Sequence, residues 1–121
     1  MKILIDDARP QRVERALAAF PLLGVTTNPT ILRAAEPSAF ASDLARLRGL
    51  VGERDLHVQV VARDTDGMLR EARVIRRIAG ERTLVKIPTT AAGLPAITAL
   101  KAQGVRVTAT AVYSTAQGLL A

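Results

Sequence analysis

Apolar residues along the chain follow two alternating patterns. Short, nearly continuous apolar runs lie at residues 2–6, 24–28, 56–62, 83–88 and 105–112, and each predicts a strand buried on both faces. Between these runs, apolar residues recur at the three- and four-residue spacing of a helix with one buried side. A strand followed by a helix, repeated along the chain, predicts an α/β fold with a parallel sheet.

Local signals predict where the helices begin and end. One helix is expected to begin near residues 37–38, and the next to be capped by Asp64 or Thr65. A threonine of residues 89–90 is expected to cap the helix that follows the fourth strand. Gly104 suits the C-terminal cap of that helix, because glycine adopts the left-handed backbone that ends many helices.

Two architectures fit repeated strand–helix units. An open doubly wound sheet has little support, because no G-x-G-x-x-G segment follows the first strand. The alternative is a (β/α)₈ barrel, which typically takes about 250 residues. We therefore expect residues 1–121 to form one incomplete TIM-barrel domain. It would run from the first strand to the start of the helix after the fifth strand.

Composition and charge narrow the classes of protein. The chain has no cysteine, which excludes disulfides and thiolate metal sites. It has no apolar run of about 18 residues and meets acidic residues early, so a cytoplasmic protein without a membrane span is expected. The net charge of +6 comes mostly from arginines scattered over predicted helices. Because aromatic residues are scarce, a solvated surface that attracts phosphorylated metabolites is favoured over a nucleic-acid partner.

The fourth apolar run, TLVKIP, carries one lysine in its middle. Side chains alternate along a strand, so if Lys86 faces inward, Leu84 shares its side while Val85 and Ile87 meet the helices. The same rule places polar side chains inward on the other strands. These residues are Asp6, Thr26, Asn28, His57, Gln59, Thr108 and Thr110. Most lie near the C-terminal ends of their strands, where parallel α/β folds build active sites.

Most of these residues also have a structural interpretation. Asp6 could cap the turn after its strand, and residues 26–28 could form a polar turn. Gln59 could be a hydrogen-bonded buried amide. His57 and Thr108 lie further from the strand ends, and for both a structural role is favoured.

Lys86 needs a different explanation, because a buried ammonium must be paired, neutralised or used. Its own strand offers no carboxylate, which leaves Asp6 as the candidate partner. With Asn28, Gln59 and Thr110 around it, a reactive amine is the favoured interpretation.

A lysine in a pocket of low polarity has a lowered pKa and is therefore a better nucleophile. Its natural reaction is attack on a ketone or aldehyde to form a Schiff base, whose iminium accepts electrons as an adjacent C–C bond breaks or forms. This class I aldol chemistry needs no metal or other cofactor. Asp6 could hold a hydroxyl or move a proton, Asn28 and Thr110 could fix hydroxyls, and Gln59 could orient a water.

Several segments also carry a family resemblance. They are ILIDD, GVTTNPTIL, HVQVV, LVKIPTT, GLPAITALKAQGV and VTATAVYSTAQGLLA. The chain resembles the fructose-6-phosphate aldolase and small-transaldolase family through almost its whole length. The resemblance implies a (β/α)₈ barrel, a sugar-phosphate or ketose substrate, and assembly as a homo-oligomer. It also implies that Lys86 forms a Schiff base with a dihydroxyacetone unit, and that Asp6, Thr26, Asn28 and Thr110 match the family's functional positions.

Gln59 bears on which activity the resemblance implies. Family members that transfer the ketol unit to an acceptor usually carry glutamate there, whereas the aldolases carry glutamine. Glutamine therefore favours aldolase, with transaldolase as the alternative.

The chain also departs from the family. It lacks the portion that would supply the last strands, an acid/base tyrosine, and the arginine and serine that hold phosphate. We do not expect it to catalyse efficiently alone. A non-catalytic half-barrel that needs a partner chain is an alternative of another class.

Overall fold

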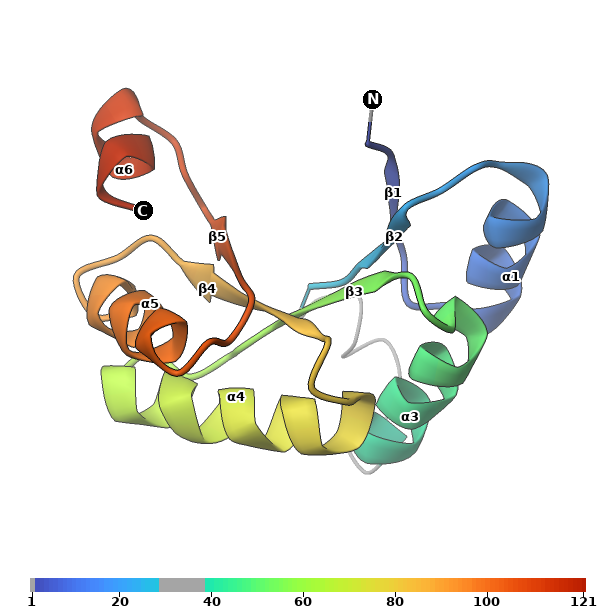
Figure 1. Cartoon of the computed structure of the whole chain (residues 1–121), viewed down its shortest axis with the longest axis horizontal. Coiled ribbons are helices and arrows are strands. Elements are labelled where there is room, and N and C mark those ends of the chain that lie inside the picture. Colours follow the sequence, from blue (N-terminus) through green and yellow to red (C-terminus); the bar gives the residue numbers. More distant parts are fainter. Residues whose placement is uncertain (1, 29–38) are drawn as a thin grey trace.

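Five parallel strands form one sheet in the computed structural model, which describes residues 2–28 and 39–121 (Figure 1). The strands are β1 (Leu4–Asp6), β2 (Gly24–Thr26), β3 (Asp55–Gln59), β4 (Leu84–Pro88) and β5 (Val107–Thr110). They pair in the order β1-β2-β3-β4-β5, all parallel. A doubly wound sheet would reverse its strand order at a switch point. The sequential order is instead that of a partial TIM barrel, as the sequence pattern predicts.

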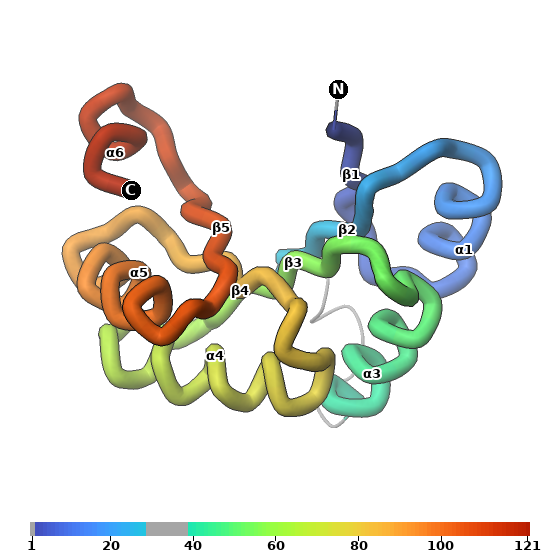
Figure 2. The backbone as a smooth tube through the Cα atoms, viewed as in Figure 1, coloured from blue at the N-terminus to red at the C-terminus, as the bar shows by residue number. Residues whose placement is uncertain are grey.

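The helices cover one face of this sheet. They are α1 (Pro10–Ala19), α3 (Phe40–Val51), α4 (Thr65–Ala79), α5 (Gly93–Ala102) and α6 (Thr115–Leu120). Helices α1, α3, α4 and α5 follow the convex side, and α6 lies beyond the end of β5 (Figure 1). The backbone curves as a trough whose concave side is open (Figure 2). That concave face is the inner face of a barrel-type sheet.

The strands are shorter than the apolar runs that predict them. The run at 56–62 becomes Asp55–Gln59, and the run at 105–112 becomes Val107–Thr110. The runs at 2–6 and 24–28 also lose residues from the strand. Cross-strand hydrogen bonds continue past the strand ends, as when the Val60 amide donates to the Lys86 carbonyl at 3.2 Å. The apolar runs therefore extend beyond the residues that form regular strands.

Two of the predicted helix caps are present. Asp64, rather than Thr65, caps α4, and its Oδ1 accepts from the Gly67 amide at 2.7 Å. At the end of α5, Gly104 has a φ of 72°, and the next amide reaches back to the Leu100 carbonyl at 3.0 Å.

Two further cap predictions have different outcomes. Before α5, the Thr90 hydroxyl accepts from the amide of Gly93, the first residue of the helix, at 3.0 Å. The predicted start of a helix near residues 37–38 lies outside the described residues, and α3 is described from Phe40.

The apolar core lies between the sheet and the helices. On β4, Val85 and Ile87 are fully buried on this side, and Val58 of β3 and Val25 of β2 are buried with them. Leucines and other apolar residues of the helices complete the core, among them Leu44, Leu47, Met68, Ala72 and Ile97. Since neighbours on a strand point to opposite faces, the residues between the buried valines must face the concave side. Within the described residues, no helix combines the length and apolarity needed to cross a membrane.

Candidate active site

Lys86 lies on the concave face in the middle of β4, as strand alternation predicts. Its side chain is half-buried, and its neighbours Val85 and Ile87 point into the core. The Lys86 Nζ donates to the Thr26 Oγ1 at 2.9 Å and to the Thr27 carbonyl at 2.8 Å. Two uncharged oxygens therefore hold the amine.

Asp6, the candidate partner of Lys86, makes no direct ion pair with it. The ion pairs found within the described residues join other groups, and Asp6 is exposed. The reason lies in the strand order: Asp6 pairs in register with Thr26 on β2, and Thr26 takes the contact with the amine. Asp6 still acts on Lys86 through its charge.

Burial lowers the pKa of the Lys86 amine, and the charge of Asp6 opposes this by raising it. The lowering prevails because taking an ammonium out of water disfavours its charged form, and no carboxylate contacts it directly. A larger neutral fraction of the amine follows, which is the form that attacks a carbonyl carbon.

Strand register places two polar residues beside Lys86. Gln59 of β3 and Thr108 of β5 are its direct partners on the neighbouring strands. Thr110 pairs with Pro88, one inward-facing position further along. Asn28 follows the end of β2, and both Asn28 and Thr110 are half-buried. The structure thus brings Gln59 and Thr108 to Lys86 and sets Thr110 toward the C-terminal edge.

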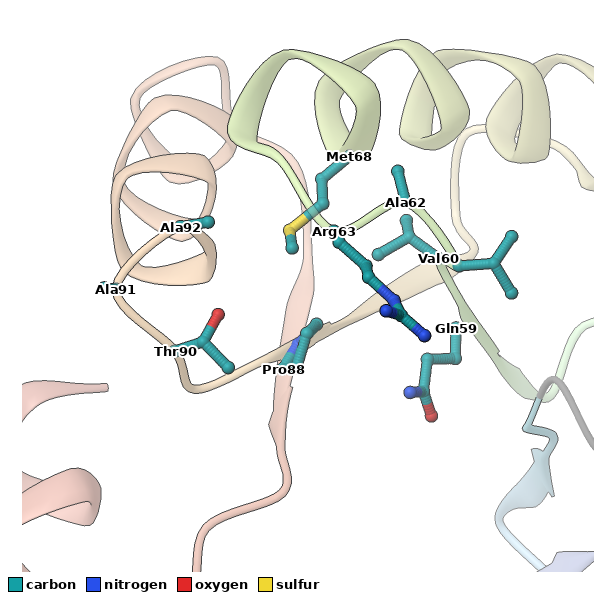
Figure 3. A pocket seen from close by; sticks show the side chains of 10 residues that line it. Gln59, Val60, Ala62, Arg63, Met68, Pro88, Thr90, Ala91 and Ala92 are labelled. Carbon is teal, nitrogen blue, oxygen red and sulfur yellow. The ribbon is translucent and has the colours of Figure 1, made fainter.

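A cavity of about 450 Å³ opens at the C-terminal ends of β3 and β4 (Figure 3). Its polar lining includes Gln59, Arg63 and Thr90, and Met68 of α4 is part of its apolar wall. Lys86 is not part of this lining, whereas Gln59 and Pro88 belong both to the cavity lining and to the concave face. Sequence reasoning did not select Arg63; its position directly after an apolar strand run was the available signal.

His57 is a second basic side chain on the concave face. It is 8% exposed, and its Nδ1 lies 2.8 Å from the Thr108 Oγ1. Its other nitrogen, Nε2, is buried without a hydrogen-bond partner within the described residues. Burial lowers the pKa of His57, as do the charges of Lys86 and Arg106, while Asp55 opposes them. These effects favour the neutral form of the imidazole.

A parallel sheet wound in sequential order, with a half-buried lysine on its inner face, defines a protein of the β/α-barrel class. The chain belongs to the transaldolase/fructose-6-phosphate aldolase family, whose sequence profile (Transaldolase/Fructose-6-phosphate aldolase) matches residues 3–121. This confirms the resemblance seen in the sequence.

One relative is a protein of Streptococcus pneumoniae (strain ATCC 700669 / Spain 23F-1) named probable fructose-6-phosphate aldolase. It is 41% identical to this chain over 122 aligned positions. The alignment covers all of this chain and 55% of the relative, so the chain spans little more than half of the relative's length.

Proposed function

We propose that Lys86 is the nucleophile of a class I aldolase that cleaves and forms the C–C bond between dihydroxyacetone and glyceraldehyde 3-phosphate. The observation that carries this proposal is a half-buried amine with a lowered pKa, held by two uncharged oxygens on the inner face of the sheet. The family and the name of the relative support the same substrate class.

The reaction starts with attack of the neutral Lys86 amine on the C2 carbonyl of fructose 6-phosphate. The resulting carbinolamine loses water to give an iminium. A base removes the proton of the C4 hydroxyl, the C3–C4 bond breaks, and its electrons pass to the iminium to form an enamine. Glyceraldehyde 3-phosphate leaves, the enamine takes up a proton at C3, and water hydrolyses the imine to release dihydroxyacetone and the free amine.

The Thr26 hydroxyl and the Thr27 carbonyl aim the Lys86 amine before it reacts. Both accept hydrogen bonds from the ammonium and from the neutral amine, so they can hold Nζ at one place through proton loss. Thr26 thus acts on the nucleophile in addition to the substrate-binding role expected of it.

The other predicted site residues would handle the substrate and its protons. Asp6 holds a substrate hydroxyl or moves a proton, because it is exposed at the end of β1 and still influences the amine through its charge. Gln59, the register partner of Lys86, orients a water. Asn28 and Thr110 fix hydroxyls near the C-terminal edge.

Transaldolase is the second candidate, since the family includes both activities. Gln59 favours the aldolase, because an amide can orient a water but cannot exchange a proton as a glutamate can. Product formation from fructose 6-phosphate, with and without erythrose 4-phosphate, separates the two. Product that forms only with the acceptor present would favour transaldolase.

We propose further that residues 1–121 form the first five β/α units of the barrel domain. In support, the sheet has five strands in barrel order and the chain spans 55% of its relative. The protein is proposed to act in carbohydrate metabolism in the cytoplasm as a homo-oligomer, with no nucleic-acid or membrane partner. Its mass in solution would test the assembly and would also reveal a half-barrel paired with another chain.

Borohydride trapping tests the role of Lys86. The protein is incubated with dihydroxyacetone or fructose 6-phosphate, reduced, digested and mapped by mass spectrometry. We expect one adduct on Lys86 and none on Lys2 or Lys101, which are exposed and serve as internal controls. Lys86→Met, which keeps the length of the side chain, should abolish the adduct. An adduct on Lys2 or Lys101, or one that persists in Lys86→Met, would overturn the assignment.

A further inference from the structure

Two side chains span the concave face in opposite directions. Lys86 on β4 reaches Thr26 on β2, so its side chain extends across β3. His57 on β3 reaches Thr108 on β5, so its side chain extends across β4. The two side chains therefore pass each other over the same pair of neighbouring strands.

The strand register joins these four residues into one set. Thr26 is the register partner of His57, and Thr108 is the register partner of Lys86. Lys86 thus bonds to the register partner of His57, and His57 bonds to the register partner of Lys86. This arrangement holds the imidazole next to the Lys86 side chain where that side chain extends toward Thr26 and Thr27.

The His57 ring is more restrained than a surface histidine. The residue is more than nine-tenths buried, and one nitrogen is held by Thr108 at 2.8 Å. The neutral form of the ring is favoured here, because a protonated ring would repel the Lys86 ammonium. The charged groups that act on it are Asp55 of the same strand, Lys86 of β4 and Arg106 just before β5.

We infer that His57, fixed by Thr108, is a positioning residue that directs the Lys86 side chain toward Thr26 and Thr27. Without the bonded ring beside it, the flexible lysine stem would sample more rotamers, and Nζ would spend less time at its two acceptors. The inference rests on the proposed function of Lys86 for its effect on Schiff-base formation. Its effect on the reactivity of the amine does not depend on that function.

The test compares variants that keep or remove the atom at the Nδ1 position. His57→Asn retains a polar atom near Nδ1, His57→Gln retains one near Nε2, and His57→Leu removes both. Thr108→Val removes the hydroxyl from the other side of the bond with little change of volume. Two rates are measured on the full chain from pH 6 to pH 9. One is borohydride trapping with dihydroxyacetone; the other is acetylation of Lys86 relative to Lys101 by acetic anhydride.

We expect His57→Leu and Thr108→Val each to slow trapping by about 3- to 10-fold, the range that one hydrogen bond of typical net strength can change a rate. Both should also change the pH profile of Lys86 acetylation. The double variant should be no slower than His57→Leu, because the two residues act through one bond. His57→Asn, which keeps a bonding atom for Thr108 but not the ring, should slow both rates less than His57→Leu does.

The inference would be overturned if His57→Leu and Thr108→Val both showed the same trapping rate and the same acetylation profile as the wild type. So would rescue by His57→Gln but not by His57→Asn, since Nε2 would then be the working atom. If His57→Leu unfolds, as judged by circular dichroism, Thr108→Val decides the outcome. Absence of any adduct in the wild type would defeat the proposed function alone, because acetylation still tests the positioning.

Discussion

Asp7 provides a pH-dependent test of how the end of β1 is held. Asp7 is 6% exposed, and its carboxylate accepts from the Arg9 amide at 2.8 Å, from Arg9 Nε at 2.9 Å and from Arg9 Nη2 at 2.6 Å. Arg12 Nη1 lies 3.9 Å away. The hydrogen bond from the Arg9 side chain is the main reason that the pKa of Asp7 is lowered from 3.8 to about 2. Burial of Asp7 acts in the opposite direction. Asp7→Asn removes the charge and leaves an oxygen that can still accept from the Arg9 amide.

The expected loss of stability can be worked from the lowered pKa of Asp7. The difference between 3.8 and about 2, at about 1.4 kcal/mol per pH unit, is roughly 2.5 kcal/mol. The Arg9 side chain is 60% exposed, so solvent screens the pair and a value of about 1 kcal/mol is more realistic. Because the folded-state pKa is the lower one, this stabilisation is complete only above about pH 5. It decreases as the pH falls through the folded-state pKa of about 2.

Urea unfolding followed by circular dichroism at several pH values between 2 and 7 measures this contribution. Asp7→Asn should be less stable than the wild type by about 1 kcal/mol at pH 7, and the two should converge as the pH falls from about 5 to 2. Glu14→Gln, on the exposed side of the adjoining helix α1, is the matched control and should change stability by less than about 0.5 kcal/mol. A difference between Asp7→Asn and wild type that stays constant from pH 7 to pH 2 would refute the electrostatic reasoning.

Three further substitutions test the fold around the site by the free energy of unfolding in urea. Gly24→Ala would set a Cβ 1.9 Å from the Asp55 carbonyl oxygen, so we expect a loss of about 3 kcal/mol or failure to fold, and near-wild-type stability would contradict the close strand packing. Leu56→Ala empties a fully buried site and should lose about 2–5 kcal/mol; a loss below 1 kcal/mol would show that the core is not packed there. Asp64→Ala removes the cap on the Gly67 amide and should lose about 1 kcal/mol, whereas no loss would mean that this cap does not stabilise α4.

The sequence by itself determined the class of fold and the face that each strand residue occupies. Strand–helix alternation is a local property of the chain, and a period of two along TLVKIP assigns Lys86 to one face and Val85 and Ile87 to the other. Helix ends were also local, as Asp64 and Gly104 show, because a cap involves only residues of the adjacent turn.

Only the tertiary structure decided which of the inward-facing residues touch. The register of neighbouring strands, and how far a side chain reaches across them, depends on how the whole sheet packs against its helices. That packing put Thr26 and the Thr27 carbonyl at the Lys86 amine and kept Asp6 from direct contact with it. It also joined His57 to Thr108 across β4, a bond between residues 51 positions apart that strand periodicity cannot specify. Periodicity fixes the direction of a side chain, whereas its partner is fixed by the curvature and register of the whole sheet.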